Sequence, residues 1–204
     1  MVENIHWLGH ASFRIDGDII IYIDPWQLPP NSPKADLILI THDHYDHCSP
    51  EDVAKIQKED TVIVTISSAA GKLRGNIKTV KPGDKVTVKG IEVEAIPAYN
   101  VNKPFHPKKA GHIGFIIEVG GKRIYHAGDT DFIPEMKGLK ADIALIPVSG
   151  TYVMTAEEAA RAVDTIKPRI AIPMHYGAIV GSSRDAERFK ELASVEVNIL
   201  PKEG

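Results

Sequence analysis

Residues 41–47 read Thr-His-Asp-His-Tyr-Asp-His, and they constrain the fold of this chain more than any other segment. Burying so many imidazole and carboxylate groups without a partner would be costly, whereas borderline divalent ions such as zinc, manganese and iron accept these ligands. The segment therefore predicts a metal site rather than a polar loop that happens to be rich in histidine. The pattern His-x-His-x-Asp-His supplies four metal-binding side chains: His42, His44, Asp46 and His47.

The segments on either side of the cluster predict a strand before it and a helix after it. Residues 36–40 are apolar and rich in branched side chains, which is typical of a buried strand. Ser49 suits an N-cap, Pro50 the first helical turn and Asp52 the acidic position of a capping box, so a helix is expected over 50–57. Catalytic groups are often mounted on such a loop between rigid elements.

The rest of the chain predicts one α/β domain over residues 1–204. Its length suffices for one sizeable core, and no Pro/Gly/Ser-rich linker divides it. One later helix is expected to start at a capping box at Thr155 and to end at Lys167-Pro168, and another opens at 182–185. Strands are expected at 5–8, 11–15, 19–23, 36–40, 61–65, 86–88, 92–96, 114–119, 123–126, 143–146, 170–172 and 195–200.

Four more candidate site residues lie near the ends of expected strands. Asp129 follows a glycine turn, and a carboxylate there could bridge two cations. His175 closes another strand and is expected to be a ligand. Asp24 is either a turn former or a buried carboxylate that orients the histidine loop. His10 either lines the site or belongs to a surface turn.

Composition limits the partners and the compartment. A net charge of -3 gives no sign of non-specific nucleic-acid binding. Cys48 is the single cysteine, so no intramolecular disulfide can form; a small buried residue is favoured over a ligand or a redox-sensitive thiol. No basic and apolar leader opens the sequence, and no apolar run approaches the roughly 20 residues of a membrane span. A cytoplasmic protein is expected.

The order of these motifs resembles that of the metallo-β-lactamase superfamily. The histidine cluster, Gly128-Asp129-Thr130 and a strand-end His175 follow one another as in that family, and Asp24 matches its early strand-end aspartate. Gly9-His10-Ala11-Ser12 is similar to a compact branch of metal-dependent hydrolases, related to ascorbate-6-phosphate lactonase and, more distantly, to the phospholipase D that acts on N-acyl phosphatidylethanolamine. The resemblance implies a four-layer αββα sandwich of two mixed β-sheets flanked by helices, with a dinuclear metal site at one edge.

The resemblance also implies a role for each ligand. Two divalent ions are expected, zinc first, with manganese or iron as alternatives. The residues carried over are His42 and His44 for the first metal, Asp46 and His47 for the second, Asp129 between them and His175 completing the second site.

The remaining ligand of the first site is open. The family usually places a histidine after a Pro-Ala pair, where this chain has Asn100, and an amide oxygen is a weaker donor than imidazole. His106 follows closely and is favoured as a ligand or substrate contact. The alternative is a one-metal or loosely occupied first site. His112 and His6 are interpreted as a strand-edge and a sheet residue.

A two-metal site would present hydroxide at neutral pH to a carbonyl carbon or a phosphorus. Asp46 is expected to orient the nucleophile and later to shuttle its proton. Tyr176, His10 or His106 is expected to stabilise developing charge or to protonate the leaving group.

Lys108 and Lys109 lie near the expected mouth and would suit a small, anionic substrate, although two adjacent lysines on a loop are more often simply solvated. A phosphodiester or sugar-phosphate lactone ranks before other lactones or amides. One competing interpretation is a non-catalytic module that binds a metal or metabolite, which Asn100 favours. Another is a di-iron redox protein, although such proteins generally carry a carboxylate where His44 stands. A homo-oligomer that adds walls to a shallow site is compatible with the short chain.

Overall fold

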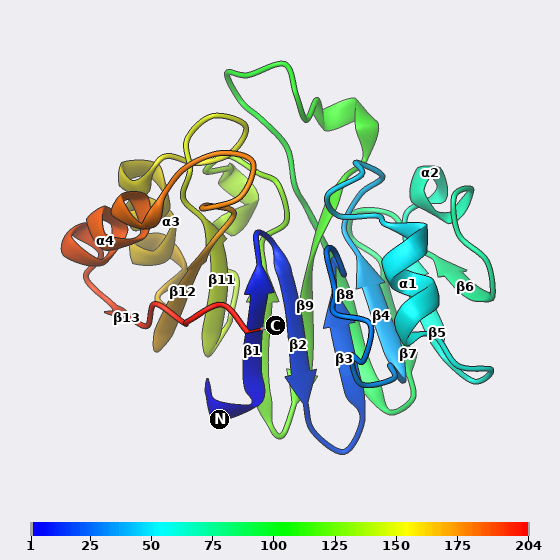
Figure 1. Ribbon diagram of the computed structural model, residues 1–204. Coiled ribbons are helices and arrows are strands. Elements are labelled where there is room, and N and C mark those ends of the chain that lie inside the picture. The colour runs from blue at the N-terminus through cyan, green and yellow to red at the C-terminus, as the bar shows by residue number, and fades with distance from the viewer. Residues whose placement is uncertain (1, 204) are drawn as a thin grey trace.

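Two β-sheets pack face to face between helices in the computed structural model, which describes residues 2–203 (Figure 1). The first sheet has antiparallel neighbours at its start and parallel neighbours from its third strand onward. Its strands, in spatial order, are β1 (Ile5–Gly9), β2 (Ser12–Asp16), β3 (Ile20–Ile23), β4 (Leu37–Ile40), β5 (Val62–Thr65) and β6 (Asn76–Thr79).

The second sheet is also mixed, because its first four strands in spatial order run parallel and the rest antiparallel. In spatial order it comprises β13 (Glu196–Val197), β12 (Ile170–Met174), β11 (Ile143–Pro147), β10 (Lys122–His126), β9 (Ile113–Val119), β8 (Ile91–Pro97) and β7 (Lys85–Val88). The two mixed sheets confirm the expected fold class.

Helices cover the two flanks of the sandwich (Figure 1). Beside the first sheet lie α1 (Pro50–Ile56) and α2 (Ser67–Ala70); beside the second lie α3 (Ala156–Ile166) and α4 (Ser183–Leu192). Three short 3₁₀ turns complete the chain: η1 (Val2–Asn4), η2 (Lys108–Ala110) and η3 (Pro134–Met136). Within residues 2–203, no helix has the length and apolar character needed to cross a membrane.

The helix ends follow the capping signals in the sequence. The Ser49 hydroxyl accepts the Asp52 N–H at the start of α1, and Thr155 and Glu158 form a reciprocal capping box at the start of α3. Lys167 ends α3 in the left-handed conformation, directly before a proline that cannot continue the helix.

Three elements differ from expectation. Two of them were not predicted: β6, an edge strand whose only apolar side chain is Ile77, and the single turn of α2. The strand expected over 195–200 is reduced to Glu196–Val197. Beyond it the chain leaves the second sheet, and the Glu203 N–H donates to the Trp7 carbonyl of β1. Tertiary packing of this tail, which local β-propensity does not report, ends the strand early.

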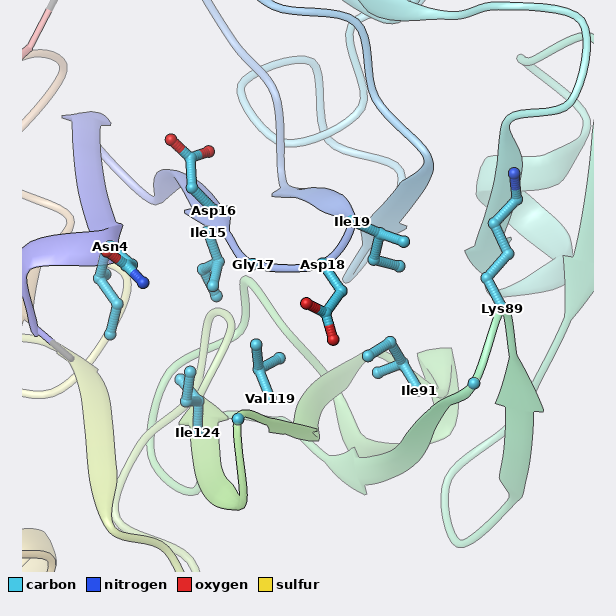
Figure 2. A pocket seen from close by; sticks show the side chains of 13 residues that line it. Asn4, Ile15, Asp16, Gly17, Asp18, Ile19, Lys89, Ile91, Val119 and Ile124 are labelled. Atoms are coloured by element: carbon cyan, nitrogen blue, oxygen red, sulfur yellow. The ribbon is translucent and has the colours of Figure 1, made fainter.

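Six strands bring the candidate site residues to one edge of the sandwich. The ends of β1, β3, β4, β8, β10 and β12 all lead into loops at the top of the view in Figure 1. The opposite edge holds a cavity of about 730 Å³ whose wall combines isoleucine and valine with Asp16, Asp18 and Lys89 (Figure 2). Lys89 at its rim is already paired with Asp60 at 2.6 Å. That cavity lacks the histidine cluster, so the chemistry is concentrated at the first edge.

Candidate metal centre

Asp129 lies at the centre of the predicted ligands. It follows β10, and its carboxylate faces imidazoles from three other loops. Its Oδ2 lies 3.2 Å from Nε2 of both His106 and His175, and its Oδ1 lies 3.3 Å from Nε2 of His47. His42 Nε2 is 3.9 Å from Oδ2. One carboxylate therefore contacts histidines that are up to 87 positions away in the sequence.

The ligands expected for the first metal come together. His42, His44 and His106 each offer a nitrogen, and these atoms lie within 4.8 Å of one another. Two of these side chains are buried, and His44 opens toward the surface. The structure thus brings His106, rather than the Asn100 side chain, to the position that the sequence left open.

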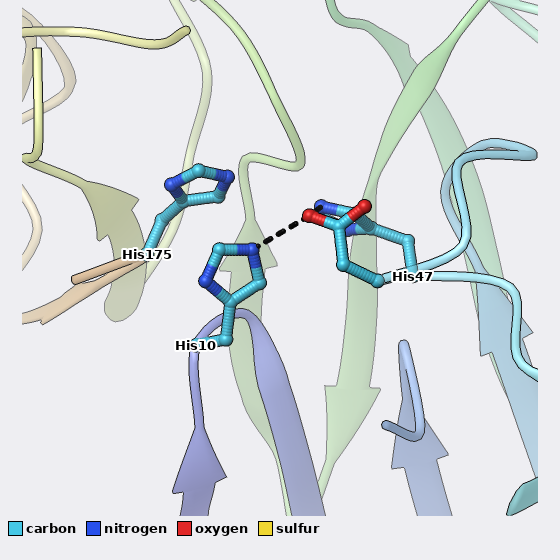
Figure 3. A group of neighbouring side chains, drawn as sticks. His10, His47 and His175 are labelled. Atoms are coloured by element: carbon cyan, nitrogen blue, oxygen red, sulfur yellow. Dashed lines mark hydrogen bonds and ion pairs between the residues drawn. The ribbon is translucent and has the colours of Figure 1, made fainter. Parts of the chain in front are cut away.

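A second group lies beside the first. His10, Asp46, His47 and His175 also offer atoms within 4.8 Å of one another. His10 Nε2 hydrogen-bonds Asp46 Oδ2 at 2.9 Å, and its ring lies 3.9 Å from that of His175. In Figure 3, His10 rises from the β1–β2 turn between His175 and His47, and the dashed line marks its bond to the carboxylate. His10 therefore lines the site.

Four of these histidines are oriented by hydrogen bonds at their Nδ1 atoms. Nδ1 of His42 lies 2.9 Å from the Thr41 hydroxyl, and that of His47 lies 2.7 Å from Asp24. The partner of His175 Nδ1 is the Ser149 hydroxyl at 3.1 Å, and His106 Nδ1 has Asn100 Oδ1 and the Tyr152 carbonyl, both at 3.2 Å. When such a ring is neutral, a donating Nδ1–H leaves the Nε2 lone pair directed into the site, which is how metal-binding histidines are usually held.

Asp24 supports the cluster from behind and is fully buried. It accepts the Thr41 N–H at 2.8 Å, the Thr41 hydroxyl at 2.7 Å and the His47 ring at 2.7 Å. Of the two alternatives in the sequence, the buried carboxylate that orients the histidine loop is the one observed.

Asn100 supports His106 in a similar way. Its Oδ1 accepts the His106 backbone N–H at 2.9 Å, and its Nδ2 donates to Asp131 at 3.1 Å and to the Tyr152 carbonyl at 2.9 Å. Lys103 Nζ also reaches Asp131, at 2.6 Å. The Asn100 amide thus fixes the loop that carries His106. Its polar atoms are engaged in these hydrogen bonds and do not act as a weak metal ligand.

Backbone conformation adds strain at the site. Asp24, His10 and His175 have φ angles of 47°, 52° and 61°. Such values are uncommon for residues with a side chain, although Asp and His tolerate them better than most. Gly128, at φ 65°, must lack a side chain because a Cβ would approach the Ile113 carbonyl oxygen to 2.7 Å. This turn sets the position of Asp129.

Burial and neighbouring charges shift the pKa values of the site residues in different directions. Burial lowers the pKa of His42 well below its ordinary value, and the neighbouring His47 adds to the effect. Burial would also lower the pKa of His47, but the charges of Asp129 and Asp24 outweigh it and raise that pKa well above the ordinary value. Conversely, burial would raise the pKa of Asp129, but His175 and His47 lower it well below the usual range. The site therefore keeps a carboxylate charge at its centre.

The residues fit a divalent metal. The Nε2 atoms of His42, His47 and His106 and Oδ1 of Asp129 are buried and have no hydrogen-bond partner within the described chain. Leaving several such atoms unpaired is costly, and a cation between them would satisfy all of them. Imidazole and carboxylate donors suit zinc, manganese and iron.

Other residues lie differently from expectation. Tyr176 is buried and stacked on Trp7 at 4.8 Å, burial raises its pKa to about 12, and it does not line the cavity over the metal centre, so its expected role at a leaving group stays a prediction. Lys108 pairs with Glu135 at 2.8 Å, and neither Lys108 nor Lys109 lines the cavity at the metal centre. These two lysines therefore do not support an anionic substrate.

His112 was missed as a site residue. Its ring stacks on that of His42 at 4.7 Å, and its Nε2 lies 3.9 Å from Asp43 Oδ1. It stands just before β9, which runs antiparallel to β8 and β10, so the start of β9 meets their ends. An expected antiparallel pairing of this strand with its neighbours would have placed His112 at the site edge. Cys48 is buried, as expected for a packing residue, and burial raises its pKa to about 11.

Comparisons with known proteins agree with this geometry. A family model described as the beta-lactamase superfamily domain matches residues 4–175. A UPF0173 metal-dependent hydrolase from Thermoplasma acidophilum is 38% identical over 210 residues, covering 94% of this chain and 92% of the relative.

Solved structures agree as well. A protein from Parabacteroides distasonis, described as a metal-dependent hydrolase, has a TM-score of 0.85 and 36% identity, and the match covers 96% of this chain and 91% of that one. A diiron beta-hydroxylase from Streptomyces venezuelae is 16% identical with a TM-score of 0.74, over 96% of this chain and 52% of its own. That last likeness shows the fold alone.

Proposed function

We propose that this chain, which belongs to the metal-dependent hydrolases of the beta-lactamase superfamily, holds two divalent ions and hydrolyses a phosphodiester or a sugar-phosphate lactone. Zinc is the first candidate, with manganese or iron as alternatives. The ligands would be His42, His44 and His106 for one ion, Asp46, His47 and His175 for the other, and Asp129 between them.

The observation that carries the proposal is the orientation of four histidines. Their Nδ1 atoms are engaged with Thr41, Asp24, Ser149 and Asn100, so each presents Nε2 to one small volume around Asp129. A purely structural cluster would pair these inner nitrogens with protein groups, and three of them have none.

Divalent ions in such a site supply a water of lowered pKa and polarise the bond to be cleaved. Asp46 is placed to orient the attacking water and to accept its proton, since its side chain lines the cavity and its Oδ2 is held by His10 Nε2 at 2.9 Å. Hydrolysis of a diester adds the water oxygen to phosphorus, breaks one P–O bond and places a proton on the departing oxygen.

An anionic substrate retains one supporting contact at the mouth. Lys72 lines the cavity of about 490 Å³ over the metal centre, together with His44 and Asp129. Asp43 lies 3.1 Å from its Nζ and offsets part of that charge. A phosphate diester carries a single negative charge, which this partly neutralised lysine can balance.

The competing functions lose their support. The non-catalytic module depended on Asn100 breaking the ligand set, whereas Asn100 hydrogen-bonds His106, which faces Asp129. The di-iron redox protein depends on a fold-level likeness, and His44 stands where a carboxylate would favour iron. A second copy of the chain that adds walls to the site stays a prediction, which sedimentation velocity tests.

The test combines metal content with hydrolysis. We expect about two equivalents of metal per chain by inductively coupled plasma mass spectrometry on untagged protein, and turnover of bis(p-nitrophenyl) phosphate. His44→Ala should lose metal and turnover while keeping its fold by circular dichroism. His6→Ala is the matched control, because His6 pairs with Asp16 and Glu203 away from the site. Full metal loading without hydrolysis of any phosphodiester or lactone would refute the proposed function.

A further inference from the structure

Apolar side chains gather around the mouth of the metal centre. Among residues 2–203, the large hydrophobic side chains that are most exposed are Tyr45, Val101, Phe105 and Ile179. Tyr45 (67% exposed), Phe105 (45%) and Ile179 (38%) line the cavity over the metal centre, and the half-buried Tyr152 joins them. These four cavity-lining residues, Tyr45, Phe105, Tyr152 and Ile179, are called the apolar collar below.

The collar is part of the metal site because each member is attached to it. Tyr45 stands between His44 and Asp46, and its ring lies edge-on to Trp26 at 6.3 Å. Phe105 precedes His106 and packs edge-on against Tyr152 at 4.7 Å. The positions of these rings are therefore set by the same loops that position the ligands.

The remaining two members lie in the loops that follow β11 and β12. The Tyr152 carbonyl accepts a hydrogen bond from Asn100 and lies 3.2 Å from His106 Nδ1, so the loop of Tyr152 is tied to the ligand loop. Ile179 lies in the loop that begins at His175. Four separate loops thus contribute one apolar side chain each to a single cavity, which scattered surface hydrophobics would not do.

Polar partners in the same cavity are few. Apart from Tyr45, Tyr152 and the ligand residues, the lining offers Asp43 and Lys72, and these two are paired with each other at 3.1 Å. A substituent rich in hydroxyl groups would lose hydrogen bonds to water and find few replacements. An apolar substituent would gain by leaving water, and a volume of about 490 Å³ is typical of a small-molecule site.

We propose that the apolar collar selects phosphodiester substrates that carry an aryl or branched alkyl substituent, in preference to polyhydroxylated sugar phosphates. This inference rests on the proposed hydrolase function and narrows its substrate class. The apolar substituent stays attached to phosphorus and lies in the collar while the other ester bond is cleaved. Water supplies the new oxygen, and the departing alcohol or phenol takes a proton.

The kinetic test uses two diesters with the same leaving group. Phenyl p-nitrophenyl phosphate and methyl p-nitrophenyl phosphate both release p-nitrophenol, so they differ in the group offered to the collar. After correction for their spontaneous hydrolysis, we expect kcat/KM to favour the phenyl ester by about 10-fold or more. Ile179→Ser and Phe105→Ala should reduce this preference to about 3-fold or less, with metal content unchanged.

Val101→Ser is the matched control. Val101 is more exposed (64%) than Phe105 and Ile179 and lies on the loop of Phe105, but it does not line the cavity. The phenyl preference should be unchanged in this variant. An equal loss of preference in Val101→Ser and Ile179→Ser would overturn the assignment to the collar.

A binding measurement separates this inference from the proposed hydrolysis. Phenylphosphonate and methylphosphonate are titrated calorimetrically into the metal-loaded protein, where no turnover occurs. Tighter phenylphosphonate binding, by about 10-fold and lost in Ile179→Ser, supports the collar even if no diester is cleaved. Equal binding of the two phosphonates overturns the collar even if both diesters are cleaved. A dimer that dissociates in Ile179→Ser, with equal phosphonate binding, would instead assign the collar to an interface between copies.

Discussion

Replacing Asn100 by alanine should loosen the loop that presents His106. Asn100 is only 7% exposed and makes hydrogen bonds to the His106 N–H, to Asp131 and to the Tyr152 carbonyl. Truncation leaves the buried His106 N–H without an acceptor, which costs about 1–3 kcal/mol, and loses further bonds worth about 0.5–1.5 kcal/mol each. We expect the metal-free protein to lose about 2–6 kcal/mol of unfolding free energy.

The same change should weaken metal binding at the first site. Removing a group that orients a metal-binding histidine typically lowers metal affinity about 10–100-fold. Urea unfolding of the metal-free protein measures the stability, and competition with a chromophoric chelator measures the affinity for each equivalent of zinc. We expect one equivalent to weaken and the other to stay close to its original affinity.

Asn102→Ala is the matched control for this prediction. Asn102 is on the same loop, but it is exposed, and its side chain accepts a hydrogen bond from Lys103 Nζ at 3.4 Å. Its removal should change stability by less than about 0.5 kcal/mol. If Asn100→Ala and Asn102→Ala unfold alike and bind zinc alike, the assignment of Asn100 as the support of His106 is wrong.

Three further predictions concern the other side chains of the centre. Asp24→Asn keeps the shape of a buried group but removes an acceptor from His47 and Thr41, so zinc affinity should fall about 10–100-fold by chelator competition; unchanged affinity would contradict the role of Asp24. The charges of Asp129 and Asp24 raise the pKa of His47 well above its ordinary value, so zinc binding should displace a proton from this ring, seen as a calorimetric enthalpy that varies with the ionisation heat of the buffer. Burial lowers the pKa of His112 to about 4, and the neighbouring His106 and His44 contribute to this decrease. Between pH 6.5 and 4, His112 is therefore protonated in the unfolded chain but neutral in the folded chain. Stability of the metal-free protein should therefore fall on acidification, and His112→Gln should reduce the slope by up to about 1.4 kcal/mol per pH unit in urea titrations; an unchanged slope would show that His112 titrates normally.

Local sequence patterns were sufficient to predict most of the helices and strands. Helix starts at Ser49 and Thr155 depend on side chains that bond the backbone three residues away, and these contacts form wherever the chain folds. Apolar runs such as that before the histidine cluster mark buried strands for the same local reason. The edge strand β6 and the short length of β13 were not predicted, because strand pairing at a sheet edge depends on which neighbouring strand is present.

The candidate site was only partly visible in the sequence. The cluster from His42 to His47 stands out because its members are adjacent in the chain, and Asp129 and His175 stand out because each closes a strand. His112 and the supporting role of Asn100 were not visible, since neither belongs to a local motif. Both depend on strand order, which places the segment between β8 and β9 beside the cluster.

The sequence by itself determined which chemical groups are present and at which strand ends they stand. The tertiary structure alone decided which of them meet: Asp129 with His106, Asp24 with His47, and the four side chains of the apolar collar. The physical reason is that a strand or helix signal acts over a few residues, whereas these contacts join positions 23 or more apart. Such contacts form only when the two sheets pack and bring their loop-bearing edges together.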